Sequence, residues 1–330
     1  MNQDCNILIT SAGRRVALLR LFQQALRDLN VPGRVCATDL TANSSAYQSA
    51  DLAFLSGRFG DPSYIPDLLE SCQQHAIRLL VPTIDTELAL YARHRDDFER
   101  IGVQLAVSDP DTLLIGSDKQ RTHQWLVANQ FPTPRQASID QVTANPADWP
   151  LPLIAKPKAG SSSIGLTPIH CLSDLDIARR LDEPVVQTIA PGKEYTVDVY
   201  VDHAGKPRCA VPRMRLETRA GEVSKGITVR HSAVQELAIA ICQALPGARG
   251  VLNVQIFADD KTGQLNVIEC NPRFGGGYPL THQAGAHFTH WLIEETMGLP
   301  LSAAIDQWQD GLVMLRYDDA VFVSRQQAGL

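Results

Sequence analysis

The sequence contains seven cysteines in 330 residues, but no two of them are spaced as Cys-x-x-Cys. Several lie in apolar runs, as Cys242 does in LAIAICQAL, so we expect buried, reduced thiols and a reducing compartment. No apolar run approaches the roughly 20 residues that a membrane-spanning helix needs. The first residues, MNQDCNILIT, also lack the pattern of a signal peptide. These absences predict a soluble, cytoplasmic protein that does not enter a membrane.

An excess of positive charge is also missing, because the formal net charge is −6. Broad binding to nucleic acid or to an anionic membrane needs a basic face, so both functions are disfavoured. The contents of 44% hydrophobic and 20% charged residues are typical of a globular enzyme or binding protein. A local positive pocket remains compatible with this charge.

The first third of the chain alternates segments with strand and helix patterns. CNILIT, RVCATD, IRLLVPT and GVQLAV read as strands, and 14–29 and PSYIPDLLESCQQHAI read as helices. This alternation predicts an open parallel α/β domain over residues 1–116, with its ligand side at the carboxyl ends of the strands. Ser11, Gly13, Asp85 and Glu87 follow predicted strands, where they could contact an ammonium or a carboxylate.

The turn after the first predicted strand is poor in glycine. SAGRR has one glycine where the dinucleotide fingerprint G-x-G-x-x-G needs three. Nicotinamide or flavin binding at this turn is therefore disfavoured.

The pattern changes from Asp118 onward. A helix over about 118–130 precedes the strand LIAKP, a Gly/Ser-rich turn, a helix near 173–181 and the strand EPVVQTI. The last third predicts an antiparallel sheet from KEYTVDVYVD, KPRCAVPRMRLE, GVLNVQIFAD and QLNVIECNP, with the helix HSAVQELAIAICQAL inserted. We therefore expect an α+β part with two lobes, over residues 117–185 and 186–330.

A lysine and a glycine-rich loop form the first candidate site. Lys156 ends the strand LIAKP and precedes the loop that runs from Gly160 to Gly165. Backbone N–H groups, hydroxyls and a mobile ammonium can surround phosphate oxygens. The order differs from the G-x-x-x-x-G-K-[ST] loop, since the lysine comes first. A surface hairpin with a solvated lysine is the alternative.

The predicted hairpin NVQIFADDKTGQLNVIECNPR carries a stronger candidate. Glu269, Asn271 and Arg273 occupy alternate positions and therefore face one side, and Gln255 can face them from the neighbouring strand. Carboxylate and amide oxygens suit Mg²⁺, and arginine suits phosphate or carboxylate. A solvated polar face is the alternative interpretation.

Two further groups of side chains each allow more than one interpretation. Arg213, Arg215 and Glu217 alternate along one predicted strand, and Lys225 lies in the following segment. They could contact a phosphate or an acceptor carboxylate, or form a charged outer face. His282, His287 and His290 have loose ligand spacing without a nearby carboxylate, so lining of an acceptor pocket or helix packing is expected rather than zinc.

Taken in order, these motifs resemble the ATP-grasp superfamily, above all the ATP-grasp module of carbamoyl-phosphate synthase large subunits and free-standing carboxylate–amine ligases. The resemblance spans about residues 1–325 and implies a pre-ATP-grasp α/β domain before a two-lobed ATP-grasp fold. For ATP it implies Lys119, Lys156, the lid residues Gly160, Ser161, Ser162, Ser163 and Gly165, the adenine hinge Gln187, Thr188, Ile189 and Ala190, and the ribose acid Glu194.

The resemblance also implies the metal and catalytic residues. Gln255, Glu269 and Asn271 match the ligands of Mg²⁺ or Mn²⁺, although many members have an acid in place of Gln255. Arg273 matches the arginine that stabilises an acyl phosphate. Arg215 and Lys225 are the other two candidates for catalytic residues.

The expected activity is ATP-dependent joining of a carboxylate to an amine through an acyl phosphate, with release of ADP and phosphate. Small-molecule substrates such as amino acids are expected, without nucleic acid or membrane partners, and a homodimer is compatible with the family. Two alternatives remain, carbamoyl-phosphate-synthase-like chemistry and a non-catalytic ATP-binding subunit.

Overall fold

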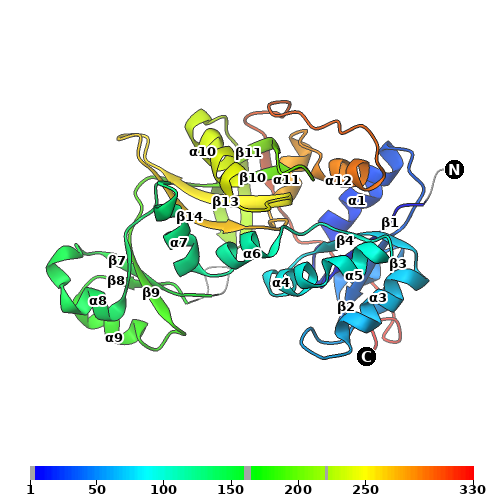
Figure 1. Cartoon of the computed structure of the whole chain (residues 1–330), viewed down its shortest axis with the longest axis horizontal. Coiled ribbons are helices and arrows are strands. Elements are labelled where there is room, and N and C mark those ends of the chain that lie inside the picture. The colour runs from blue at the N-terminus through cyan, green and yellow to red at the C-terminus, as the bar shows by residue number, and fades with distance from the viewer. Residues whose placement is uncertain (1–3, 160–164, 220–221) are drawn as a thin grey trace.

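The structure is a computed structural model that describes residues 4–159, 165–219 and 222–330. Its first sheet is parallel and has the strand order β3-β2-β1-β4-β5 (Figure 1). The strands are β1 (Asn6–Thr10), β2 (Val35–Asp39), β3 (Leu52–Leu55), β4 (Ile77–Pro82) and β5 (Gln104–Leu105). The predicted open parallel α/β fold is confirmed. β3 was not predicted, and only two residues of GVQLAV form a strand.

Helices cover both faces of this sheet, so its central strands are buried on two sides. Ile7 and Ile9 of β1 belong to one core with α1, whereas Leu8 belongs to the core with α3 and α4. Such continuous apolar strands are typical of parallel sheets between helices. The helices are α1 (Val16–Asp28), α2 (Ser45–Ser49), α3 (Tyr64–Gln74), α4 (Asp85–Arg93), α5 (Arg95–Arg100) and α6 (Pro110–Gly116).

A small antiparallel sheet forms the second part, drawn at the left of Figure 1. Its order is β6-β9-β7-β8, with β6 (Gln136–Ser138), β7 (Leu153–Pro157), β8 (Thr167–Ile169) and β9 (Pro184–Thr188). The helices are α7 (Lys119–Ala128), α8 (Ile139–Ala144) and α9 (Leu175–Ala178), and 3₁₀ turns occupy Pro146–Asp148 and Leu172–Asp174. The boundary expected after residue 185 falls inside β9.

The helix predicted near 173–181 is shorter than expected. The Asp174 carboxylate accepts hydrogen bonds from the backbone N–H groups of His170 (2.8 Å) and Cys171 (3.1 Å). These bonds hold a tight 3₁₀ turn at its start, and only four residues, Leu175–Ala178, follow as α-helix.

The third sheet has the order β14-β13-β10-β11-β12-β15. Its strands are β10 (Lys193–Val201), β11 (Pro207–Arg219), β12 (Glu222–Thr228), β13 (Gly250–Ala258), β14 (Leu265–Asn271) and β15 (Val313–Leu315). The helices of this part are α10 (Ser232–Ala244), α11 (Tyr278–Gln283) and α12 (Phe288–Thr296). The chain end returns to the first domain (Figure 1), where Gln48 Nε2 donates to the Gln327 carbonyl at 2.8 Å.

One face of this sheet is apolar, and the other combines polar side chains with apolar residues that pack in the core with α1 and α12: Tyr200, Cys209, Val211 and Val251. Val197, Val199, Val254 and Val267 belong to one buried cluster with residues of α10. The pairing of β10, β11, β13 and β14 places on the opposite face Glu194, Thr196, Asp198, Arg213, Arg215, Asn253, Gln255, Glu269 and Asn271. We expect this cluster of polar side chains to have a function beyond packing, because burying polar groups does not by itself stabilise a core.

No helix among the described residues is both long and apolar enough to cross a membrane.

Candidate active site

The centre of the polar face is a carboxylate and three amides on β13 and β14. The register places Gln255 opposite Glu269 and Asn253 opposite Asn271. Asn271 Nδ2 donates to Glu269 Oε1 at 3.0 Å and to Asn253 Oδ1 at 3.3 Å. The structure therefore brings the three predicted metal ligands to one face, and it adds Asn253, which the sequence reading missed. Alternation along GVLNVQIFAD was the signal for Asn253, since it lies two residues before Gln255.

Two lysines from the second part lie within electrostatic reach of Glu269. Lys156 is buried on β7, and its Nζ donates to Gln187 Oε1 at 2.9 Å. Burial lowers the pKa of Lys156 to about 8, Glu269 opposes this effect and Lys119 adds to it. Burial also lowers the pKa of Lys119, and the Glu269 carboxylate opposes this shift. The two ammonium groups and Glu269 thus form one cluster.

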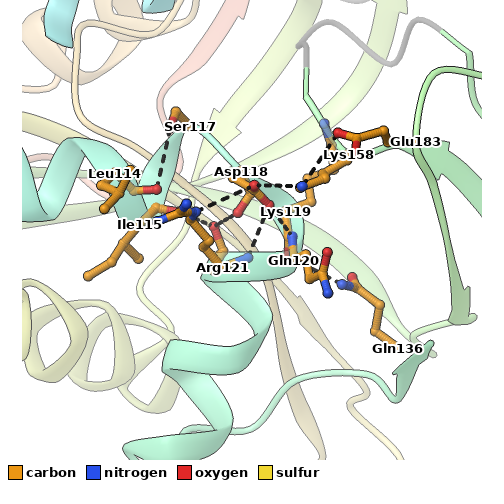
Figure 2. Close-up of polar contacts among 11 residues, drawn as sticks. Leu114, Ile115, Ser117, Asp118, Lys119, Gln120, Arg121, Gln136, Lys158 and Glu183 are labelled. Atoms are coloured by element: carbon orange, nitrogen blue, oxygen red, sulfur yellow. Dashed lines mark hydrogen bonds and ion pairs between the residues drawn. The ribbon is translucent and has the colours of Figure 1, made fainter. Parts of the chain in front are cut away.

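Lys119 is the first residue of α7, and Figure 2 shows the polar contacts around this helix start. The Asp118 carboxylate caps the helix by accepting from the backbone N–H groups of Gln120 (2.8 Å) and Arg121 (3.1 Å). It also pairs with Lys158 Nζ at 3.5 Å, and the backbone N–H of Lys119 donates to the Lys158 carbonyl at 3.0 Å. These contacts join α7 to the end of β7, so both predicted phosphate-binding lysines are held by neighbouring elements.

The predicted adenine hinge follows β9. Gln187 is buried and bonded to Lys156, whereas the Ile189 side chain is half exposed. The backbone N–H of Thr188 already donates to the Arg135 carbonyl at 3.0 Å, so a purine contact at Thr188 would need another of its groups. Of the predicted lid, Gly165 is described, and Gly160, Ser161, Ser162 and Ser163 lie outside the described residues.

The predicted ribose acid and one predicted catalytic arginine form a pair. Glu194 on β10 meets Arg215 on β11, with an oxygen–nitrogen distance of 3.3 Å. Burial raises the pKa of Glu194, Arg215 lowers it, and Glu269 raises it further. The structure thus places Arg215 beside Glu194. A register shift of β11 follows Arg215, so the expected alternation does not continue to Glu217.

Lys225 lies apart from this cluster. It is opposite Glu217 on the β11–β12 pair, at a distance of 2.6 Å between Nζ and Oε2, and both side chains are about half exposed. This arrangement matches the charged outer face that the sequence left open as the alternative.

Arg273 follows β14 and is held by the first domain. Its Nε and Nη2 donate to the two oxygens of Asp85, at 2.7 and 2.6 Å, and its Nη1 donates to the Phe274 carbonyl at 3.3 Å. Asp85 lies in the first turn of α4. The bidentate pair fixes the plane of the guanidinium. From the sequence, Asp85 was predicted to contact a ligand directly, and its pairing with Arg273 was not predicted.

Arg213 is buried and paired with Asp198, at 2.8 and 2.9 Å. Gly277 lies against this pair, because a Cβ at that position would be 2.0 Å from Arg213 Nη1. Glycine is therefore required where the loop after Arg273 crosses the sheet.

The remaining predicted residues of the first domain form hydrogen bonds within that domain. Thr10 Oγ1 donates to the buried Glu87 carboxylate at 2.8 Å, and Ser11 Oγ also donates to Glu87. The backbone N–H of Gly13 donates to Asp39 at 2.9 Å. Burial raises the pKa of Glu87, which the hydrogen bonds from Ser11 and Thr10 oppose.

Comparison with known proteins identifies two matching families along the chain. Residues 7–106 match the PylC-like N-terminal domain, and residues 116–277 match the ATP-grasp domain. A D-alanine–D-alanine ligase of Cupriavidus taiwanensis is 32% identical over 143 residues, which is 39% of this chain and 43% of that protein. A D-alanine–D-alanine ligase of Corynebacterium efficiens is 27% identical over 265 residues, which is 71% of this chain and 64% of that protein. The matched segments thus span 43% and 64% of these two relatives.

Solved structures show the same fold. The biotin carboxylase domain of Hydrogenobacter thermophilus 2-oxoglutarate carboxylase matches with a TM-score of 0.75 and 16% identity, covering 94% of this chain and 74% of that one. N5-carboxyaminoimidazole ribonucleotide synthetase from Thermotoga maritima matches with a TM-score of 0.67 and 20% identity, covering 91% of this chain and 77% of that one. With the two domain matches and the three sheets described above, the chain belongs to the ATP-grasp superfamily.

Proposed function

We propose that the protein is an ATP-dependent carboxylate–amine ligase that forms an acyl phosphate and then an amide, releasing ADP and phosphate. The observation that carries this proposal is the cluster of Glu269 and Asn271 with Lys119 and Lys156, bordered by Arg273. Attack of a carboxylate on the γ-phosphorus brings two anions together, so a binding site needs this density of positive charge.

ATP is the proposed nucleotide. Lys119 and Lys156 would contact its phosphates, and residues 187–190 would contact the adenine. Glu194, which Arg215 holds in position, would accept hydrogen bonds from the ribose hydroxyls.

The donor set of the polar face fits a divalent metal ion of the hard class. Glu269 offers carboxylate oxygens, and Gln255, Asn271 and Asn253 offer amide oxygens on the same face. Thr196 Oγ1, opposite Gln255, is a buried hydroxyl with no hydrogen-bond partner among the described residues. Glu269 and Asn271 would hold Mg²⁺ or Mn²⁺ with help from Gln255. When bound, the ion would offset charge on the ATP phosphates.

The proposed acceptor side lies next to Arg273. A cavity of about 300 Å³ is bordered by Gly275, Gly276 and the N-terminal end of α1. Four arginines and two carboxylates line it: Arg14, Arg15, Arg20, Arg316, Glu222 and Asp319. This excess of positive charge suits a substrate that carries a carboxylate. Amino acids are the proposed substrate class, supported by relatives named for the ligation of D-alanine to D-alanine.

A screen of amino-acid pairs for ADP and phosphate release tests the proposal. We expect ADP formation that depends on both a carboxylate and an amine, with one amide per ADP in the mass spectrum. ADP formation with bicarbonate alone as the carboxylate would favour the carbamoyl-type alternative. ATP binding without turnover for any pair would favour the binding subunit, and AMP as product would contradict the ligase mechanism.

The affinity for ATP should fall as the pH rises above 8. Lys156 has a pKa of about 8 in the protein without ligand, and only its protonated form attracts phosphate. ATP binding should therefore weaken by about tenfold per pH unit above this value, because one proton is linked to binding. Isothermal titration from pH 7 to pH 9.5 measures the effect.

Two variants show whether Lys156 is the titrating group. Lys156→Met should bind ATP more weakly at pH 7 and turn over more slowly, and its affinity should be nearly independent of pH in this range. Lys158→Met removes a neighbouring ammonium that pairs with Asp118 and Glu183, and it should keep the pH dependence. An unchanged ATP affinity in Lys156→Met, with only a higher KM for the acceptor, would contradict the assignment.

A further inference from the structure

Three histidines gather where α11 is followed by α12. His282 lies in α11, His287 immediately precedes α12, and His290 lies in the first turn of α12. One nitrogen of each ring lies within 4.8 Å of the others. None of these side chains belongs to the proposed ATP or acceptor site. The cluster therefore needs an explanation of its own.

A carboxylate from a distant part of the chain pairs with one histidine of this cluster. Asp28 is the last residue of α1, and its Oδ2 lies 3.1 Å from His290 Nε2. The Asp28 side chain is 45% exposed and that of His290 is 12% exposed, so the cluster opens to solvent on this side. Zinc was disfavoured from the sequence because no carboxylate joins the histidines there. The fold brings Asp28 to His290 from 262 residues away.

One pair of ring nitrogens in the cluster has the spacing of two ligands on a tetrahedral ion. His282 Nε2 and His287 Nδ1 are 3.3 Å apart. Ligand nitrogens at about 2.0–2.1 Å from a tetrahedral ion are separated by about 3.4 Å. A hydrogen bond between two neutral imidazoles would also give this distance, but it would leave His290 and Asp28 as a separate pair beside it.

The other nitrogen of His282 is already oriented. His282 is buried, and its Nδ1 lies 3.3 Å from the hydroxyl of Tyr278. That hydroxyl accepts a hydrogen bond from the backbone N–H of Thr289 at 3.2 Å. With its proton on Nδ1, His282 donates to the Tyr278 hydroxyl, and this bond fixes the ring and leaves the Nε2 lone pair for the ion, as is usual in a metal-binding histidine.

The cluster also favours neutral rings. Burial lowers the pKa of His282 to about 3, and His287 and His290 add to this effect. Three positively charged imidazoles could not share this space, whereas neutral imidazoles present lone pairs to a cation.

We propose that His282, His287 and His290, with Asp28 beside His290, form a site for a divalent transition-metal ion of the zinc class. Three imidazoles and one carboxylate favour Zn²⁺, Co²⁺ or Ni²⁺ over Mg²⁺. The ion would join the C-terminal end of α1 to α11 and α12, which otherwise meet through the apolar core around Phe288. Its role is to stabilise this contact between the domains, and it does not depend on the ligase reaction.

The test uses the untagged full chain, stripped with EDTA and dialysed. After incubation with ZnCl₂ and gel filtration, we expect about one zinc per chain by elemental mass spectrometry and a higher Tm than in the stripped protein. Co²⁺ in place of zinc should give the visible absorption of a tetrahedral complex. These readouts need no ATP and no substrate, so they stand apart from the test of the ligase.

His287→Ala and Asp28→Asn should each weaken zinc binding by about tenfold or more and remove the zinc-dependent rise in Tm. Both positions are partly exposed, so these variants should fold, as circular dichroism can show. His203→Ala is the matched control, since His203 is 43% exposed and pairs with Glu295 outside the cluster. Absence of zinc from the native chain, or equal zinc affinity in His287→Ala and the native chain, would overturn the proposal.

Discussion

Replacing Glu269 by alanine is expected to reduce ATP-dependent turnover by about 100-fold or more at saturating Mg²⁺. Loss of the one carboxylate in the predicted metal set should cost several kilocalories per mole of transition-state stabilisation. Asn271→Ala should also lower ATP-dependent turnover, because the Asn271 amide contacts both Glu269 and Asn253. Coupled measurement of ADP release gives the rates.

The fold should tolerate both changes. Glu269 and Asn271 are only partly buried on the polar face, and the apolar face with Val254 and Val267 is unaffected. Circular dichroism and Tm should therefore stay near the values of the unmodified protein. Glu70→Ala, an exposed change on α3, is the matched control and should keep full activity. If either site variant keeps more than about a tenth of the activity, the metal-ligand assignment is wrong.

Local patterns predicted the elements that carry this site. Alternation in IECNPR places Glu269 and Asn271 on one face of β14, and the register confirms that Gln255 is opposite Glu269. Helix periodicity likewise predicted α1, α7 and α10 close to their observed bounds. Such inferences succeed because side-chain direction follows from the period of a single element.

Contacts between distant segments could not be read in the same way. Arg273 meets Asp85 across 188 residues, and neither position marks the other in the sequence. The irregularity of β11 was also hidden, because a register shift after Arg215 depends on how β12 pairs with it. β12 itself was missed, since Gly226 and Ser224 interrupt its strand pattern.

The pairing of Asp85 with Arg273 changes the expected role of the first domain. Two of the three guanidinium nitrogens of Arg273 are bound to the Asp85 carboxylate, which comes from the first turn of α4. Nη1 also donates to the Phe274 carbonyl, so the guanidinium is held in one plane, and the second N–H groups of Nη1 and Nη2 can face a substrate without first losing side-chain freedom. We therefore infer that Asp85 is a positioning residue and that Arg273 touches the acyl group.

Arg273→Lys is expected to lower kcat by about 10²–10³-fold with a smaller change in the KM for ATP. Lysine keeps the charge but loses the planar fork that can hold a carboxylate before attack and the acyl oxygen afterwards. Asp85→Asn should lower kcat by about tenfold, because the amide keeps the shape and one acceptor. If Asp85 has only a structural role, Asp85→Asn should lower Tm and leave kcat per folded molecule unchanged. Turnover of Arg273→Lys within tenfold of the native rate would reject the role of Arg273.

Isotope transfer tests the acyl phosphate directly. When a carboxylate oxygen attacks the γ-phosphorus, that oxygen stays with phosphate after the amine has broken the acyl C–O bond. With ¹⁸O in the substrate carboxylate, the native chain should therefore place one ¹⁸O in phosphate for each amide formed. Without the amine, the label should reach phosphate only slowly, through hydrolysis of the trapped intermediate. Arg273→Lys should lower both rates while keeping the same label ratio, because the route is unchanged and only its barrier rises. Unlabelled phosphate released with ADP would leave the fold standing and reject the ligase, since the carboxylate would then never have attacked ATP.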